Sequence, residues 1–332
     1  MKDDQFKLMK AVRQHEPGGK LVIESVPVPR PEKGEVLIRM QAAPVNPSDL
    51  TLLKGGYLER EYPFTPGLEG SGLVVESGGG MMGNIRTGKL VACTPGAGGD
   101  GTWAEYIKTS AMHTVPLPPG ITPEQGSMML VNPMTAIALM EIAKKGHHQA
   151  VVNNAAASAL GKMLIRLSGE SDLPLINIVR REEQAEELRS LGARYVLNSS
   201  DPSFKETLKS RAAGLQATLF LDAIGGEQTS VLMKAAPRGA TLLVYARLSW
   251  EPMTVDPGWM IVEGKIIEGF QLGRWLQAKS PVSRLRYVSQ VKKKISGALG
   301  STVRRIMPME QVNEAISLYK KEMSSGKVIL KL

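Results

Sequence analysis

Small side chains fill residues 155–159, which follow a short run of β-forming residues, Ala150–Asn153. Apolar residues then recur at helical spacing through 160–167, and a second β-rich run, Leu175–Val179, comes after them. This order predicts a strand, a tight turn, a helix and another strand, which together make a βαβ unit. A helix N-terminus presents free N–H groups and the positive end of its dipole, so such a turn can hold the pyrophosphate of a dinucleotide.

The turn departs from the glycine pattern G-x-G-x-x-G that dinucleotide-binding folds commonly use. Its three positions carry Ala156, Ser158 and Gly161, and only the last of them is glycine. Ser158 is nevertheless small enough for phosphate to approach the backbone, and its hydroxyl can donate a hydrogen bond. An ordinary helix start is the alternative interpretation. If a dinucleotide binds here, the residues that contact it are Ala156, Ser158, Ala159, Leu160 and Gly161.

Two arginines, Arg180 and Arg181, follow the second strand. Proteins that bind NADH commonly place an acidic residue there, about 20 residues after the fingerprint, to bind the ribose 2′-hydroxyl. A guanidinium group suits a 2′-phosphate instead, because it donates two charge-assisted hydrogen bonds at once. We therefore expect the cofactor to be NADPH rather than NADH. A surface arginine pair without a ligand is the alternative.

Composition argues against several classes of protein. The chain has 332 residues, of which 42% are hydrophobic, and this is enough for two domains with cores. The net charge is +9, but the basic residues are scattered, without repeats or an aromatic platform, so nucleic-acid binding is not expected. The single cysteine, Cys93, excludes an internal disulfide and a cysteine-rich metal site. No signal core or membrane span is evident, and we expect a cytoplasmic enzyme.

The pattern of elements changes near residue 122. Before residue 122, β-rich runs alternate with clusters of proline and glycine. A helix start and a glycine-rich turn interrupt this pattern. We expect the helix at Asn46-Pro47-Ser48-Asp49, capped by Ser48 or Asp49, and the turn at Gly78–Gly83. After it, strands and helices alternate. The sequence thus predicts an α/β protein: a mostly antiparallel β-barrel domain, residues 1–122 completed by 268–332, with an inserted doubly wound parallel-sheet domain, residues 123–267.

Several short motifs occur in an order that is typical of one superfamily. They are Asn46-Pro47-Ser48-Asp49, Gly55-Gly56-Tyr57, Gly101-Thr102-Trp103, Val131-Asn132-Pro133-x-Thr135-Ala136, Asn154-Ala-Ala-Ala-Ser158-Ala-Leu-Gly161, Asn177-Ile-Val-Arg180 and Gly269-Phe270-x-Leu272-x-x-Trp275. With these motifs the chain resembles the medium-chain dehydrogenase/reductase superfamily, and within it the zinc-free quinone oxidoreductases and mitochondrial-type 2-enoyl thioester reductases. The resemblance covers essentially the whole chain and implies a GroES-like catalytic domain with an inserted Rossmann domain.

The resemblance also bears on metal binding. Where zinc-dependent members of the superfamily carry a cysteine, this chain has Asn46, and where they carry Gly-His-Glu it has Gly67-Leu68-Glu69. A catalytic zinc needs about three protein ligands, and Glu69 by itself does not supply them. His147-His148 precedes the first strand of the inserted domain, and we interpret this pair as solvated. We therefore expect no metal.

Roles for individual residues follow from the resemblance. It makes Tyr57 the proton donor or oxyanion stabiliser, which a phenol with a pKa of about 10 can be at neutral pH; an aromatic lid is the alternative. It places Asn46 near the nicotinamide ribose or the substrate carbonyl; a helix cap is the alternative. Other expected cofactor contacts are Asn132, Thr135, Gly225, Gly226, Tyr245, Phe270 and Leu272, and the expected substrate-pocket residues are Tyr62 and Trp275. A buried helix kink is the alternative for Asn132 and Thr135, and ordinary core packing is the alternative for Phe270, Leu272 and Trp275.

Reduction of an activated double bond suits a site without a metal, because hydrogen-bond donors can stabilise the developing enolate-like charge. We expect hydride transfer from NADPH to the β-carbon of a 2-enoyl thioester. An NADPH:quinone oxidoreductase or small-enone reductase is the first alternative, and a non-catalytic NADPH-binding protein is the second. The superfamily, and the sheet edge that doubly wound domains leave exposed, predict a homodimer.

Overall fold

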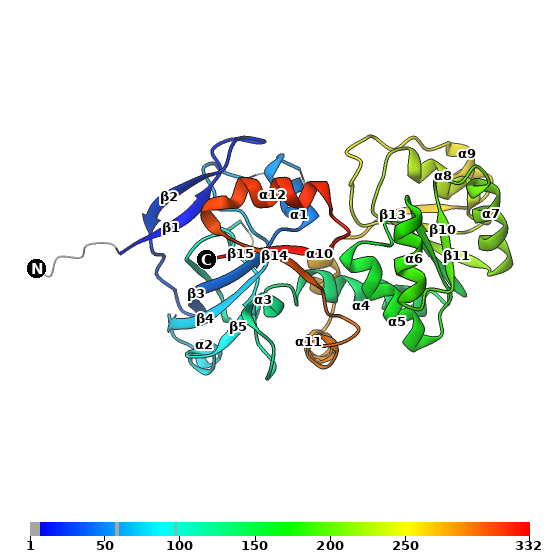
Figure 1. Cartoon of the computed structure of the whole chain (residues 1–332). Helices are drawn as coiled ribbons and strands as arrows, with labels where there is room; N and C mark the ends of the chain where they lie inside the picture. Colours follow the sequence, from blue (N-terminus) through cyan, green and yellow to red (C-terminus); the bar gives the residue numbers. More distant parts are fainter. Residues whose placement is uncertain (1–6, 57–59, 97) are drawn as a thin grey trace, which may run out of the picture. The chain divides into compact units, whose positions relative to one another are not determined.

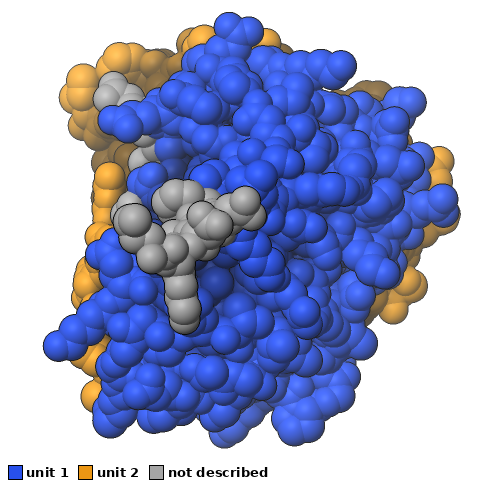
Figure 2. Space-filling view, turned by 90° about the vertical axis from the view of Figure 1, so that its left-hand side faces the viewer, with its two compact units in different colours: residues 1–132, 288–296, 300–332 blue, residues 133–287, 297–299 orange. Residues whose placement is uncertain are grey.

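A computed structural model describes residues 7–56, 60–96 and 98–332. The chain divides into two compact units, which Figure 2 colours separately: unit 1 comprises 1–132, 288–296 and 300–332, and unit 2 comprises 133–287 and 297–299. Each unit is built on its own β structure (Figure 1). In the described ranges, no helix is both long and apolar enough to span a membrane.

Unit 1 is mostly antiparallel β structure. Its main sheet has the order β14-β15-β3-β4-β5-β7, with β6 paired to β3, while β1 and β2 pair with each other. The strands are β1 (Leu8–Arg13), β2 (Val22–Pro27), β3 (Glu35–Pro44), β4 (Gly70–Ser77), β5 (Leu90–Cys93), β6 (Tyr106–Ser110), β7 (Thr114–Pro116), β14 (Val303–Pro308) and β15 (Lys327–Lys331). Since β15 pairs with β3, the end of the chain returns to the first sheet, which confirms the predicted insertion.

The helices of unit 1 are short. They are α1 (Pro47–Leu53), α2 (Met81–Arg86), α3 (Pro123–Gly126) and α12 (Val312–Lys321), with 3-10 turns η1 (Ala111–His113) and η2 (Met309–Gln311). Helix α12 buries Val312, Ile316 and Tyr319 in a core that it shares with β15. Their spacing places them on one face of the helix.

Two local predictions for unit 1 are wrong. Helix α1 is capped by Asn46, with Pro47 as its first residue, because proline has a fixed φ that suits this position. The stretch expected as a glycine-rich turn contains the start of helix α2. Gly83, inside this helix, packs so closely on Ser77 that a Cβ would lie 2.4 Å from the Ser77 hydroxyl oxygen. Glycine there serves close packing rather than a turn.

Unit 2 is a doubly wound parallel sheet. Its strand order is β10-β9-β8-β11-β12-β13, which in chain order is 3-2-1-4-5-6, the order of dinucleotide-binding folds. The strands are β8 (Ala150–Asn153), β9 (Leu175–Val179), β10 (Tyr195–Asn198), β11 (Ala217–Asp222), β12 (Thr241–Val244) and β13 (Ile266–Gly269). The helices that lie in or enter this unit are α4 (Val131–Lys145), α5 (Ala159–Ser171), α6 (Glu182–Ser190), α7 (Phe204–Gly214), α8 (Glu227–Ala235), α9 (Pro257–Ile261), α10 (Leu272–Gln277) and α11 (Pro281–Lys294).

The central strands of unit 2 are buried on both faces. Val152, Ile176 and Phe220 pack in one core with α7 and α8, which lie beside each other (Figure 1). Alternate residues such as Val151 and Leu219 are buried as well. Strands covered on both faces read as continuous apolar runs, which is why they were recognisable in the sequence. The predicted fold class is confirmed.

The compact units divide the chain at 132/133 and at 287/288, whereas the sequence pattern predicts limits at 122/123 and 267/268. Helix α3 ends at Gly126 and α4 begins at Val131, and Pro133 lies in the first turn of α4, where proline is tolerated. At the second limit, Trp275 packs on Tyr287, and Tyr287 donates a hydrogen bond to Glu141 in α4. These contacts place α10 and the first part of α11 in unit 2.

Candidate functional site

The turn between β8 and α5 has the geometry that a phosphate group requires. Ser158 caps α5, and its hydroxyl oxygen accepts a hydrogen bond from the Gly161 N–H at 3.1 Å. An α-helix leaves its first N–H groups without acceptors inside the helix, so those of Ala159 and Leu160 are placed to meet an anion. The Ser158 proton can still be donated, which adds a further group for phosphate.

Close packing explains the glycine of this turn. A Cβ on Gly161 would lie 2.2 Å from the carbonyl oxygen of Ala156, so a larger residue would push α5 away from the turn. Ala156 is itself fully buried. Ala155 has a φ of 50°, a left-handed conformation that alanine adopts only at an energetic cost. Small residues therefore build the turn, as the sequence predicts, and its backbone is strained at Ala155.

A buried carboxylate, Asp222, organises the turn after β11. Its Oδ1 accepts from Asn154 Nδ2 at 2.6 Å and from the Gly225 N–H at 2.9 Å, while its Oδ2 accepts from Thr229 Oγ1 at 2.7 Å. Gly225 and Gly226 have φ values of 74° and 59°, which glycine adopts without steric penalty. Strands β8 and β11 are neighbours where the strand order reverses, and doubly wound sheets bind their ligands at this point.

Asn153 and Tyr245 lie at the same edge of the sheet. The Tyr245 hydroxyl donates to Asn153 Oδ1 at 3.4 Å, and burial, together with the charge of Asp222, raises the pKa of Tyr245 well above its ordinary value. Asn153 is fully buried, and its Nδ2 has no hydrogen-bond partner in the described part of the chain. Since an unpaired buried donor costs about 1–3 kcal/mol, Asn153 is a candidate ligand-binding residue that the sequence did not indicate.

Arg180 and Arg181 follow β9 with exposed side chains. The Arg180 backbone is held by two hydrogen bonds: its N–H donates to Gln184 Oε1 at 3.3 Å, and Ser200 Oγ donates to its carbonyl oxygen at 2.9 Å. Strand β9 pairs with β8, so the arginines lie at the carboxyl end of the strand next to the phosphate turn. The residues present fit NADPH: helix N–H groups for the pyrophosphate and guanidinium groups for the 2′-phosphate.

Three of the predicted site residues follow β13: Phe270, Leu272 and Trp275. Phe270 is partly buried, and its N–H donates to the Val244 carbonyl oxygen at 2.8 Å, which keeps it next to the end of β12. Leu272 begins α10. Trp275 packs against Tyr287 with ring centroids 4.9 Å apart, and Lys279 Nζ lies 4.4 Å from the indole centroid.

Trp275 also lines a cavity of about 330 Å³ within unit 2, together with Glu141, Lys279 and residues of β11 and β12. Burial alone would raise the pKa of Glu141, but hydrogen bonds from Lys145, Tyr287 and Lys279 lower it to about 2. Glu141 is therefore already paired with Lys145, Lys279 and Tyr287.

In unit 1, Asn46 belongs to a cluster of buried polar groups. Its Nδ2 donates to Glu69 Oε1 at 3.0 Å, and its Oδ1 accepts from Lys327 Nζ. Asn46 is 1% exposed and Lys327 is 2% exposed. Because an ammonium group can only donate, the contact with Lys327 fixes which end of the amide is the oxygen.

Two carboxylates complete this group, which we call the buried ionic cluster: Asn46, Asp49, Glu69 and Lys327. Glu69 Oε2 accepts from the N–H groups of Leu130 and Val131 at 3.1 and 2.9 Å, at the start of α4. Asp49 accepts from the Asn46 N–H at 2.8 Å and from the Leu68 N–H at 3.0 Å. The cluster therefore ties Asn46 to the beginning of the helix that carries Asn132 and Thr135.

Burial controls the charges of the cluster. It raises the pKa of Asp49 to about 7, raises the pKa of Glu69 and lowers the pKa of Lys327, while the attraction between the acids and the lysine opposes each shift. Two acids share a single ammonium group, so a proton on Asp49 removes the excess negative charge. Elsewhere among the described residues, no group of three or more His, Cys, Asp or Glu side chains is arranged to hold a metal ion.

The remaining predicted residues lie near this cluster in the chain. Tyr57 is outside the described residues. Tyr62 is partly buried and packs edge-on against Phe64, with ring centroids 5.3 Å apart. Asn132 is partly buried and Thr135 is buried, both in the first turns of α4.

Sequence reasoning missed Lys327, Asp49 and Asp222 as site residues. Lys327 is 281 positions from Asn46, and a lysine that opens a terminal strand normally lies in solvent. Asp222 ends an apolar strand directly before two predicted cofactor glycines, so its position was a usable signal. Asp49 stands three residues after the true cap of α1, which is the acidic position of a capping box.

Comparison with known proteins gives a consistent result. Residues 32–119 match the family model of the alcohol dehydrogenase GroES-like domain. The chain is 29% identical to the mitochondrial enoyl-acyl-carrier-protein reductase of Xenopus tropicalis, over 83% of this chain and 80% of that protein. It is 30% identical to the corresponding enzyme of Caenorhabditis elegans, over 77% and 74%. A proposed NADPH:quinone reductase from Mesorhizobium loti has a similar structure, with a TM-score of 0.89, 33% identity and 98% of both chains covered.

Proposed function

Because the chain belongs to the medium-chain dehydrogenase/reductase superfamily, in its zinc-free branch of oxidoreductases, we propose that it reduces activated double bonds with NADPH. The substrate we propose is a 2-enoyl thioester, a class supported by the similarity to two mitochondrial enoyl reductases over most of each chain. The observation that carries the cofactor assignment is the small-residue turn at α5 beside two exposed arginines at the end of β9.

NADPH, when bound, supplies the hydride that the β-carbon of the substrate receives. The chain must then stabilise negative charge on the thioester carbonyl oxygen and deliver a proton to the α-carbon. We assign the proton donor to Tyr57, on the basis of the superfamily resemblance. A neutral phenol can donate a hydrogen bond to the carbonyl oxygen and a proton to the enolate-like species.

Asn46 is proposed to act as a hydrogen-bond donor near the substrate carbonyl or the nicotinamide ribose. Its Oδ1 is occupied by Lys327, and one Nδ2 proton is used by Glu69. The second Nδ2 proton is then the group that Asn46 can offer to a ligand. The contacts with Lys327 and Glu69 thus favour a donor role for Asn46 over an acceptor role.

Steady-state kinetics with crotonyl-CoA and 1,4-naphthoquinone, each with NADPH, test the proposal. We expect turnover with crotonyl-CoA, and Tyr57→Phe should lower kcat by about 100-fold while leaving NADPH affinity unchanged, because general acids contribute about 10²–10⁴-fold. Tyr106→Phe, on strand β6, is the matched control. Full kcat in Tyr57→Phe would refute the assignment of the proton donor.

A quinone or small enone is the second candidate substrate, and the similarity to the proposed quinone reductase from Mesorhizobium loti favours it. Turnover with naphthoquinone and none with crotonyl-CoA would select this alternative. Measurable NADPH binding without turnover of either compound would indicate a non-catalytic nucleotide-binding protein.

A homodimer through the edge of the unit 2 sheet is also proposed. Strand β13 ends the strand order, and its neighbourhood presents Ile261, Val262 and Ile266, which are 82%, 64% and 46% exposed. Two such edges pairing with each other would continue the sheet and cover these side chains. Light scattering should give a dimer for the wild type and a monomer for Ile266→Lys. A monomeric wild type would contradict the proposal.

Cytoplasmic localisation stays a prediction from the sequence.

A further inference from the structure

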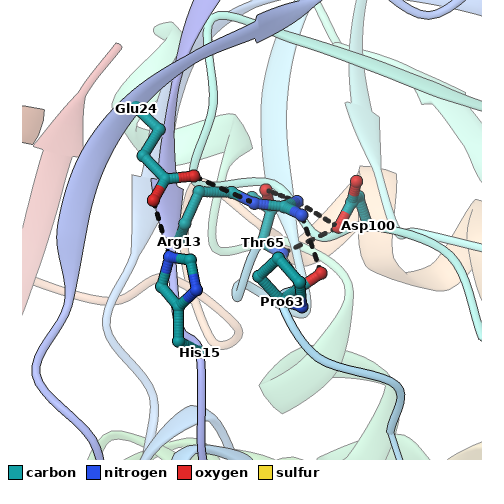
Figure 3. A network of polar contacts seen from close by, with 6 residues as sticks. All are labelled: Arg13, His15, Glu24, Pro63, Thr65 and Asp100. Carbon is teal, nitrogen blue, oxygen red and sulfur yellow. Dashed lines mark hydrogen bonds and ion pairs between the residues drawn. The ribbon is translucent and has the colours of Figure 1, made fainter.

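Arg13 is the centre of a polar network that joins separate parts of unit 1 (Figure 3). It is the last residue of β1, and its side chain is 12% exposed. Its Nη1 donates to Thr65 Oγ1 at 3.1 Å and to Asp100 Oδ1 at 3.0 Å, and its Nη2 donates to the Pro63 carbonyl oxygen at 2.7 Å. Asp100 also accepts from the Thr65 N–H at 2.7 Å. One guanidinium group therefore holds residues 63–65 against both Asp100 and β1.

A second arm of the network points away from these residues. Glu24, on β2, lies with Oε2 3.9 Å from Arg13 Nε, and its Oε1 bonds to His15 Nε2 at 2.6 Å. In Figure 3, Glu24 and His15 lie on the opposite side of the guanidinium from Asp100. His15 is 54% exposed, so this arm can be removed with little effect on residues 63–65.

Residues 66–69 are held in place by close packing instead. A Cβ on Gly67 would lie 2.4 Å from Thr102 Oγ1, and a Cβ on Gly101 would lie 2.3 Å from the Pro66 carbonyl oxygen. The Thr102 N–H donates to the Gly67 carbonyl oxygen at 3.1 Å. This packing fixes the part of the segment that leads to Glu69. The hydrogen bonds of Arg13 therefore act on the other part, 63–65.

Tyr62 directly precedes residues 63–65. Its ring packs edge-on against Phe64, and the Arg60 guanidinium lies 5.6 Å from the Phe64 centroid while donating to the Gly99 carbonyl oxygen at 2.7 Å. We propose that Arg13 and Asp100 are positioning residues that fix Tyr62 in the substrate pocket. The proposal rests on the proposed function and on the prediction from the sequence that Tyr62 lines its substrate pocket.

Arginine is required at position 13 because three acceptors must be satisfied by one side chain in a fixed plane. A lysine keeps the charge but concentrates it at one nitrogen, which lacks the fork geometry of a guanidinium group. Arg13→Lys therefore tests the geometry of the network while conserving its charge. Asp100→Asn conserves size but replaces the charged carboxylate of the ion pair by a neutral amide, and His15→Ala removes only the imidazole of the second arm.

Kinetics with crotonyl-CoA give the first measurement. Arg13→Lys and Asp100→Asn should each lower kcat/KM roughly tenfold, since small displacements of substrate-positioning groups have effects of this order or larger, whereas the Kd of NADPH should stay within about twofold. His15→Ala should match the wild type. Tyr62→Ala should lower kcat/KM in the wild type but add little in Arg13→Lys. A full additional loss from Tyr62→Ala in the Arg13→Lys background would overturn the proposal, and so would wild-type kcat/KM in Arg13→Lys.

The second measurement does not depend on turnover. In protein labelled with 3-fluorotyrosine, the 19F resonance of Tyr62 can be identified by its loss in Tyr62→Phe. Arg13→Lys should shift or broaden this resonance and leave those of Tyr195 and Tyr319 unchanged. If the wild type turned over no substrate, the proposed function would fail. The effect of Arg13→Lys on the Tyr62 resonance would still test whether Arg13 positions Tyr62. An unchanged Tyr62 resonance in Arg13→Lys would overturn that role in either case.

Discussion

Replacing Asp49 by asparagine should flatten the pH dependence of folding stability. Asp49 is fully buried, and burial raises its pKa to about 7 from an ordinary 3.8. In the unfolded chain the same carboxyl group ionises near the ordinary value. Between these two pKa values the folded protein holds a proton that the unfolded protein has lost, so the free energy of unfolding decreases as the pH rises.

The size of this effect follows from the difference between the two pKa values. Each pKa unit corresponds to about 1.4 kcal/mol, so the wild type should lose on the order of 4 kcal/mol across the window from about pH 4 to about pH 7. Asp49→Asn has no such proton to release and should lose far less. The new amide group leaves a backbone N–H, of Asn46 or Leu68, without its acceptor, which costs about 1–3 kcal/mol at every pH.

Urea titrations at about pH 5 and about pH 7.5 give the free energy of unfolding of the wild type and of Asp49→Asn. The two proteins are compared by the change in this free energy between the two pH values, not by its absolute size. Asp172→Asn is the control, because the side chain of Asp172 is 95% exposed, and this variant should keep the wild-type slope. If the free energy of unfolding of Asp49→Asn fell with pH as steeply as that of the wild type, the assignment of a protonated Asp49 would be wrong.

Three other variants test separate contacts. Lys327→Met should lower the free energy of unfolding by about 3–5 kcal/mol in urea titrations, because it leaves the buried carboxylates without their cation, and a loss below about 1 kcal/mol would contradict the ionic cluster. Gly161→Ala should weaken NADPH binding and lower Tm, since its Cβ has no room, whereas Gly169→Ala in the same helix, with no atom within 4 Å of its Cβ, should raise Tm slightly. The double variant Arg180→Ser and Arg181→Ser should raise the Kd of NADPH about 100-fold, the loss of roughly two charge-assisted hydrogen bonds, and leave that of NADH unchanged in fluorescence titrations. Equal losses for both cofactors would refute recognition of the 2′-phosphate.

Local spacing was sufficient to predict much of unit 2. The limits of β8 and β9, Ala150–Asn153 and Leu175–Val179, are confirmed to the residue, because their apolar runs are bounded by polar residues or proline. The packing role of Gly161 also follows from a local pattern. Helix α2 was missed since Gly83 has a packing role there that composition cannot distinguish from a turn.

The buried ionic cluster could not be predicted, for a different reason. Nothing near Lys327 in the sequence indicates that its side chain reaches Asn46, and pairing across such a separation is decided by the position of β15 in the sheet. The sequence indicates Asn46 and Glu69 only separately, Asn46 as a possible cofactor contact and Glu69 as an insufficient metal ligand. Their mutual hydrogen bond is a property of the folded unit. The role of Tyr57 stays a prediction.

The position of β15 affects how the protein is made. Lys327 is translated after all of unit 2, so the nascent chain contains Asp49 and Glu69 for most of its synthesis without the lysine that neutralises them. Unit 2 consists of nearly continuous sequence and can fold on the ribosome, as domains generally do, while the first sheet still waits for its late strands. A chaperone that protects nascent chains should therefore associate with residues of unit 1 for longer than with those of unit 2.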